Sequence, residues 1–244
     1  MELYYKEYNT PEIEIPQSTI ILDKGFAGAL HTIQEYPNFL CWEAWVIEKI
    51  KNNTEGYFDF SKNIIDIGAG LGEYCWLLPF NHAYAFEPNK KTEYLIHTNL
   101  VLHDRVDTVD TFNCLLSDKV EDVNFDGFTC HEVTHVSDKN PVSLKQTSIL
   151  DNFNLDNIGL IKIDVEGMEE KVLRGGIGTI IRNNYPPILF ECWNVECEGM
   201  TQEKHDSLFN YLKSLGYEIL EYWGDWETHL AVHKNQMKKD KCYI

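Results

Sequence analysis

The apolar positions of this chain fall into short β-branched or aromatic runs, and stretches with helical spacing separate them. An unbroken apolar run of this length is typical of a strand that is buried on both faces of a parallel sheet. The runs lie at residues 63–67, 83–87, 111–116, 158–165 and 186–191. Further strands are expected at 217–222 and 229–233. The helical stretches lie at residues 41–51, 74–78, 88–102, 168–173 and 201–215. Strands and helices that alternate along a chain predict an α/β fold.

The helices carry apolar residues on one side, which predicts the faces that they bury. The first helix is expected to bury Trp42, Trp45, Val46 and Ile50. The helix at 88–102 is expected to bury Leu95, Ile96 and Leu100. The helix at 201–215 is expected to bury Leu208, Tyr211, Leu212 and Leu215, with Gly216 ending it.

We expect one domain, at residues 41–235, with two additions. Residues 1–40 are expected to pack on it as an irregular extension, because Pro11 and Pro16 interrupt any regular pattern. Residues 119–148 are polar with weak alternation, which predicts a β-hairpin insertion. Residues 236–244 form a basic tail.

The run at 63–67 passes through Asp66 into a turn that contains Gly68, Gly70 and Gly72. A strand, a glycine-rich turn and a helix form the nucleotide-binding corner of an α/β fold. The dinucleotide fingerprint would place a third glycine at position 73, where this chain has a glutamate that disfavours a phosphate. Glu87 follows at about the 20-residue spacing at which an acid accepts hydrogen bonds from ribose hydroxyls.

This combination indicates S-adenosylmethionine (SAM), although a purely structural turn is the alternative. Ligands of open parallel sheets bind at the carboxyl ends of the strands. We therefore expect the cofactor to contact Asp66, Gly68, Ala69, Gly70, Glu87, Pro88, Asn89, Leu116, Ser117 and Asp164. Leu116 and Ser117 are expected to flank the adenine ring, or to form a simple turn from strand to loop.

Five segments together resemble the FkbM-type SAM-dependent methyltransferases, over roughly residues 60–235. They read D-I-G-A-G-L-G, A-F-E-P-N, L-L-S-D, I-K-I-D-V-E-G-M-E-E-K-V-L-R-G-G and P-P-I-L-F-E. The resemblance implies a Rossmann-like class I methyltransferase fold. Such a fold has a seven-stranded sheet, parallel except for one strand near the C-terminus, with helices on both faces. It also implies methylation of a hydroxyl of a sugar or natural product. Gly70 departs from the family, which often has asparagine there.

Methyl transfer to a weakly acidic hydroxyl calls for a general base near the cofactor. Asp164 is the first candidate to face the cofactor and the substrate, and capping the next helix is its alternative role. Glu166 is either catalytic, or it caps that helix or orients the turn at Gly167. Glu191 is either a base or substrate-binding group, or part of a buried ion pair. His229 is a further candidate base, or a structural histidine. Clustered carboxylates can hold Mg²⁺, but the spacing does not require it, so no metal is predicted.

The net charge of −18 disfavours a partner bound through its phosphate backbone and suits a neutral acceptor such as a sugar or glycan. The seven cysteines include no C-x-x-C pair, which indicates reduced thiols and a cytoplasmic protein. No signal-peptide pattern and no long apolar run occur, so no membrane partner is expected. The alternatives are an N-methyltransferase acting on protein or nucleic acid, and a non-catalytic module that binds SAM. Glu73 disfavours an oxidoreductase.

Overall fold

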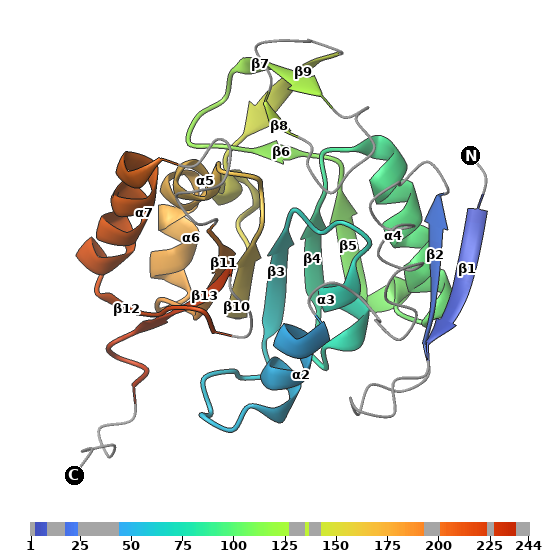
Figure 1. Cartoon of the computed structure of the whole chain (residues 1–244), viewed down its shortest axis with the longest axis horizontal. Coiled ribbons are helices and arrows are strands. Elements are labelled where there is room, and N and C mark those ends of the chain that lie inside the picture. Colours follow the sequence, from blue (N-terminus) through green and yellow to red (C-terminus); the bar gives the residue numbers. More distant parts are fainter. Residues whose placement is uncertain are drawn as a thin grey trace.

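A computed structural model describes residues 3–8, 18–23, 44–126, 135–136, 143–192, 201–223 and 227–237. Its centre is a seven-stranded sheet (Figure 1). The strands are β3 (Asn63–Ile67), β4 (Ala83–Phe86), β5 (Val109–Phe112), β10 (Ile158–Ile163), β11 (Ile188–Glu191), β12 (Tyr217–Leu220) and β13 (Thr228–His233). Their order is β12-β13-β11-β10-β3-β4-β5. Only β13 runs antiparallel to its neighbours in this sheet, which confirms the expected fold.

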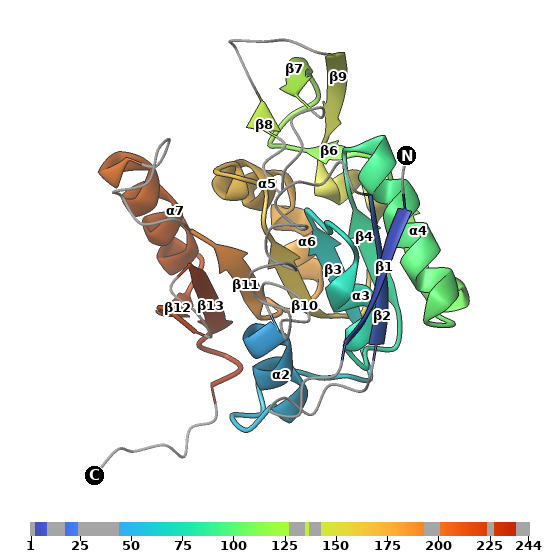
Figure 2. The same cartoon turned by 45° about the vertical axis from the view of Figure 1, so that its right-hand side comes forward.

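Helices cover both faces of the sheet (Figures 1 and 2). They are α2 (Ala44–Asn52), α3 (Glu73–Leu77), α4 (Lys90–Leu102), α5 (Glu169–Gly175), α6 (Ile177–Arg182) and α7 (Gln202–Ser214). Side chains of a strand alternate between the faces, so Ile64 packs with α2, α3 and α4, whereas Ile65 packs with α5, α6 and α7. No described helix has the length and apolar character that a membrane span needs.

Two details of the helices differ from expectation. Trp45 on α2 is 49% exposed, whereas Val46 and Ile50 are buried as expected, together with Ile47. Trp42 lies outside the described residues. The helix predicted to stop at residue 173 continues to Gly175, and α6, which was not expected, follows at once.

Part of the N-terminal extension is regular, contrary to expectation. β1 (Leu3–Tyr8) and β2 (Ser18–Asp23) form an antiparallel pair, and β2 lies beside α4 (Figures 1 and 2). Pro11 and Pro16 fall between the two strands, where they interrupt neither ladder. The prolines between the two strands therefore led the sequence pattern to predict an irregular segment where a strand pair forms.

The run predicted as one strand at 111–116 is two. β5 ends at Phe112, Cys114 N–H bonds back to the Phe112 carbonyl at 2.9 Å, and β6 (Leu115–Leu116) joins a second sheet. That sheet has the order β6-β9-β7-β8, with β7 (Asp122–Asp126), β8 (His135–Val136) and β9 (Ser143–Ser148). The insertion that was expected as a hairpin is thus a larger sheet, in which β7 pairs antiparallel with both β8 and β9, and it lies over the carboxyl ends of the main strands (Figure 1).

Candidate active site

The turn after β3 is pressed between two neighbouring strand ends. The N–H groups of Gly68 and Ala69 both donate to the Phe86 carbonyl, at 2.9 and 3.1 Å. Gly68 has φ +75°, and a Cβ at this position would lie 1.7 Å from the backbone oxygen of Asp164. No other residue type fits there, because both the backbone angle and the neighbouring strand exclude a side chain.

The next glycine of the turn, Gly70, borders open space rather than a neighbouring strand. Gly70 has φ +54°, and a Cβ there would meet no atom within 4 Å. Its N–H donates to Glu87 Oε2 at 3.2 Å, while Glu87 Oε1 accepts from Asn89 N–H at 2.7 Å. These two bonds orient a carboxylate beside an open stretch of backbone. The Glu87 carboxylate can accept hydrogen bonds from the ribose hydroxyls of an adenosine at this place, and its negative charge disfavours a phosphate.

The Glu87 carboxyl is only 5% exposed, and this burial raises its pKa to about 7. Pro88 and Asn89 follow it and begin α4, whose first turn is capped by the Asn89 side chain accepting from Lys91 N–H at 3.0 Å. Glu87 therefore lies in the short connection between the end of β4 and the start of α4, and both elements fix its position.

A buried lysine next to this turn links the two central strands, β3 and β10, through an ion pair. Lys162 on β10 stands in register with Asp66 on β3. Its Nζ lies 3.9 Å from Asp66 Oδ1 and 3.2 Å from Asp164 Oδ2, and it donates to the Gly68 carbonyl at 3.3 Å. Asp66 has no exposed surface, and burial raises its pKa. The ammonium thus ties the glycine turn to the end of β10. Asp66 supports this turn from below, so a direct cofactor contact for it stays a prediction.

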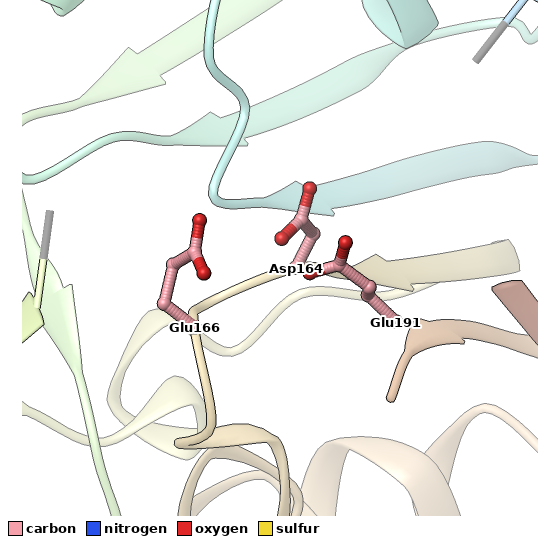
Figure 3. A group of neighbouring side chains, drawn as sticks. All are labelled: Asp164, Glu166 and Glu191. Carbon is pink, nitrogen blue, oxygen red and sulfur yellow. The ribbon is translucent and has the colours of Figure 1, made fainter. Parts of the chain in front are cut away.

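Three carboxylates meet at the ends of β10 and β11 (Figure 3). Asp164, Glu166 and Glu191 each offer an oxygen within 4.8 Å of the others. Burial, together with the charges of Asp164, Glu166 and Glu227 and a hydrogen bond to Asp164, raises the pKa of Glu191 far above its ordinary value. The structure thus brings together the three acids that the sequence singled out.

Glu166 reaches this group through an unusual backbone angle, φ +58°. A glutamate in the left-handed region costs conformational energy, and such strain clusters at functional sites. The turn itself is held by Glu169, whose Oε1 accepts from Val165 N–H at 3.2 Å and from Gly167 N–H at 3.0 Å. The turn-orienting role weighed for Glu166 thus belongs to Glu169, whose pKa burial raises to about 7.

His229 does not join the acids. It pairs with Phe190 across β11 and β13, so both side chains point to the face covered by α7, and its ring stacks on Phe190 at 5.4 Å between centroids. Tyr222 N–H donates to its Nδ1 at 3.3 Å, and its Nε2 lies 3.4 Å from the Cys192 carbonyl. Both ring nitrogens thus meet backbone groups, on the face opposite the acids.

Leu116 and Ser117, expected beside the adenine, are buried at the start of the insertion sheet. The Ser117 carbonyl lies so near Gly175 that a Cβ there would come within 2.0 Å of it. These contacts explain the burial by packing against α5, and a role beside the adenine stays a prediction.

Sequence reasoning passed over four residues of this region: Lys145, Lys162, Glu169 and Asn113. Lys162 carried a signal, because it is the single charge in the apolar strand I-G-L-I-K-I. A charge buried in such a strand needs a partner on a neighbouring strand, and Asp66 was the acid available. Lys145, Glu169 and Asn113 carried no such signal in the sequence, because their partners lie far along the chain or are backbone groups.

The carboxylates of Asp164, Glu166 and Glu191 are oxygen ligands of the kind that Mg²⁺ prefers. Acid groups of this kind also occur without an ion. The expectation that no metal is needed therefore stays a prediction.

Comparisons with known proteins agree with this geometry. The model of the methyltransferase FkbM domain matches residues 51–219. The crystal structure of methyltransferase FkbM from Methylobacillus flagellatus KT is similar, with a TM-score of 0.56 and 18% identity, over 87% of this chain and 56% of that one. The chain therefore spans little more than half the length of that protein.

A putative caffeoyl-CoA O-methyltransferase from Staphylococcus aureus has a TM-score of 0.53 and 13% identity, over 87% of this chain and 93% of that one. At these identities the likenesses show the fold alone. No curated protein matches the chain. Since the family model covers more than half of the chain, this protein belongs to the FkbM methyltransferase family.

Proposed function

We propose that this enzyme transfers a methyl group to a hydroxyl oxygen of a sugar or glycan. The observation that supports the proposal is the carboxylate group of Asp164, Glu166 and Glu191 at the carboxyl ends of β10 and β11, beside the glycine turn, in which burial and neighbouring charges raise the pKa of Glu191. A hydroxyl is a poor nucleophile until a base accepts its proton. A carboxylate whose pKa is raised is a stronger base than an ordinary one, so this group suits an oxygen acceptor.

The residues divide the work. When bound, SAM supplies a methyl group on a positively charged sulfur, which an aligned nucleophile can displace. Glu87 and the backbone of Gly70 would hold the ribose, and the tight turn at Gly68 sets that site against the end of β10. Lys162 fixes one oxygen of Asp164. Alignment of this kind supplies a large part of the rate of a displacement reaction.

Glu191 receives the proton in this scheme. Its Oε atoms lie in the acid group, and its protonated form hydrogen-bonds to Asp164. Only the ionised form accepts a proton from the acceptor hydroxyl. Because the pKa of Glu191 is raised, the ionised fraction increases as pH rises above neutrality, and the rate of methyl transfer rises with it.

The test combines binding with turnover. Calorimetry measures SAM binding, and methyl transfer is then assayed over a panel of mono- and oligosaccharides. In Glu191→Gln, we expect the rate on an accepted sugar to fall by roughly 100-fold or more, and its rise with pH to disappear. Glu170→Gln is the matched control, because Glu170 pairs on the surface of α5 with Arg174 at 2.6 Å and lies outside the acid group.

The alternatives give different results. A free amine needs no strong base, so an N-methyltransferase would barely slow in Glu191→Gln. A non-catalytic module would bind SAM and turn over no acceptor. SAM binding with no accepted sugar would refute the sugar assignment and leave the cofactor standing.

A further inference from the structure

Lys145 crosses from the insertion sheet to the cofactor corner. It lies on β9, and its Nζ donates to the Pro88 carbonyl and, at 3.1 Å, to Asn113 Oδ1. The Asn113 amide in turn donates to the carbonyls of Glu87 at 2.9 Å and Pro88 at 3.1 Å. The backbone that carries the Glu87 carboxylate is therefore held by two side chains that come from outside β4.

The contact spans 57 residues of sequence and joins two sheets. β9 is the strand of the insertion that pairs with both β6 and β7, so its position determines that of the whole insertion sheet. The Lys145 ammonium also lies 5.4 Å from the ring centroid of Phe125 on β7, which packs the lysine against the insertion itself. Lys145 is thus a rigid link rather than a loose surface side chain.

The charges around Lys145 and the burial of Glu87 have opposite effects on the pKa of Glu87. Glu87 faces Lys145 from β9 and Lys162 from β10, and its carboxylate also accepts the N–H groups of Gly70 and Asn89. Both lysines and both N–H groups favour the ionised carboxylate, whereas burial favours the neutral one.

Lys145 in turn faces Glu87, Cys114 between β5 and β6, and Glu93 on α4, and burial lowers its pKa. Lys162 already serves Asp66 and Asp164, at 3.9 and 3.2 Å. Among the described residues of the insertion, Lys145 is the cation whose charge acts on Glu87.

We propose that Lys145 is a positioning residue for the cofactor: it fastens the insertion sheet to the β4 turn and holds a positive charge beside the Glu87 carboxylate that binds the ribose. The inference rests on the place given to Glu87 under the proposed function. An ionised Glu87 accepts hydrogen bonds from ribose hydroxyls, and a protonated one loses part of that capacity. Removal of the lysine therefore shifts the loss of cofactor affinity to higher pH.

The experiment measures binding of S-adenosylhomocysteine by calorimetry between about pH 6 and 9, around the pKa of about 7 of Glu87. In the unaltered protein, affinity falls as pH drops through this value. In Lys145→Met, the fall begins at higher pH, and a pKa shift of one unit weakens affinity by up to about fivefold near neutral pH, because the ionised fraction of Glu87 then drops from about one half to about one eleventh. The difference in affinity between the two proteins becomes smaller at alkaline pH, where Glu87 is ionised in both.

Two further variants separate the possible causes. Lys145→Arg keeps the charge and restores the original pH profile. Lys119→Met is the matched control, because Lys119 is in the same insertion but is 63% exposed and pairs with Glu121 at 2.9 Å. Circular dichroism at each pH checks that every variant is folded.

The outcomes distinguish this inference from the proposed function beneath it. Glu87→Gln is expected to bind weakly at every pH, with the pH dependence abolished. If Glu87→Gln binds as well as the unaltered protein, the ribose assignment fails. If Glu87→Gln is weak but Lys145→Met matches the unaltered profile, or is weakened equally at every pH, Lys145 has no charge-dependent role and the inference is overturned.

Discussion

Replacement of the buried lysine, Lys162→Met, tests how the two central strands are held together at the site. The change keeps the length of the side chain and removes the ammonium. Asp66 then remains with no exposed surface and without its cation. A buried charge that loses its partner destabilises a protein strongly, because neither water nor another group replaces the interaction.

The magnitude follows from the geometry. At 3.9 Å, the attraction between Lys162 Nζ and Asp66 Oδ1 is about 4 kcal/mol for an effective dielectric of about 20. The pair with Asp164 adds less, because the Asp164 side chain is 28% exposed. We expect the free energy of unfolding to fall by about 3–5 kcal/mol at neutral pH, the range measured when one partner of a buried pair is removed.

The loss is expected to depend on pH. The folded-state pKa of Asp66 is already raised by burial, and it rises further once the cation is gone. The folded protein then binds a proton that the unfolded chain has released, so stability falls as pH rises above the unfolded pKa of about 4. Lys162→Met is therefore nearest to the unaltered protein in acid and furthest from it at alkaline pH.

The assay is urea unfolding followed by circular dichroism, at several pH values, for both single variants and the double variant Asp66→Asn with Lys162→Met. The double variant leaves no buried charge in this pair, so it should recover at least about 1.5 kcal/mol relative to the sum of the single losses. Additive losses, or a loss independent of pH, would refute the ion pair as the element that holds the strands.

Two further changes test the local geometry. Gly68→Ala places a Cβ 1.7 Å from the Asp164 backbone oxygen, so we expect calorimetry to find no SAM binding and urea unfolding to show a loss beyond the ~1 kcal/mol of the left-handed backbone alone. Asp151→Ala removes the carboxylate that accepts from Gly178 N–H at 2.9 Å and Thr179 N–H at 2.6 Å, so stability should fall by about 1 kcal/mol while SAM affinity stays unchanged; an altered affinity would contradict a purely structural role.

The main sheet was predictable because its information is local. A mostly apolar strand, a glycine turn and an acid at the end of the next strand lie within 25 residues, from Asn63 to Glu87. The ends of parallel strands meet at one edge of a sheet, so the sequence alone places Asp164 and Glu191, which end two of the strands, at the same edge. The insertion was expected as a β-hairpin, but its pairing with β6, the strand pair at the N-terminus and the break after Phe112 were not predictable in the same way, because each depends on pairing between separate segments.

By itself, the sequence determined the fold class and the edge of the sheet at which the chemistry lies, since periodicity and chain order control both. Only the tertiary structure decided how the groups at that edge are charged and oriented. Asp66 and Lys162 are far apart in sequence, and Lys145 reaches Pro88 from another sheet. His229 turned to the opposite face because its strand register pairs it with Phe190. Register and burial are properties of the packed chain, and they determine which carboxylates keep their charge.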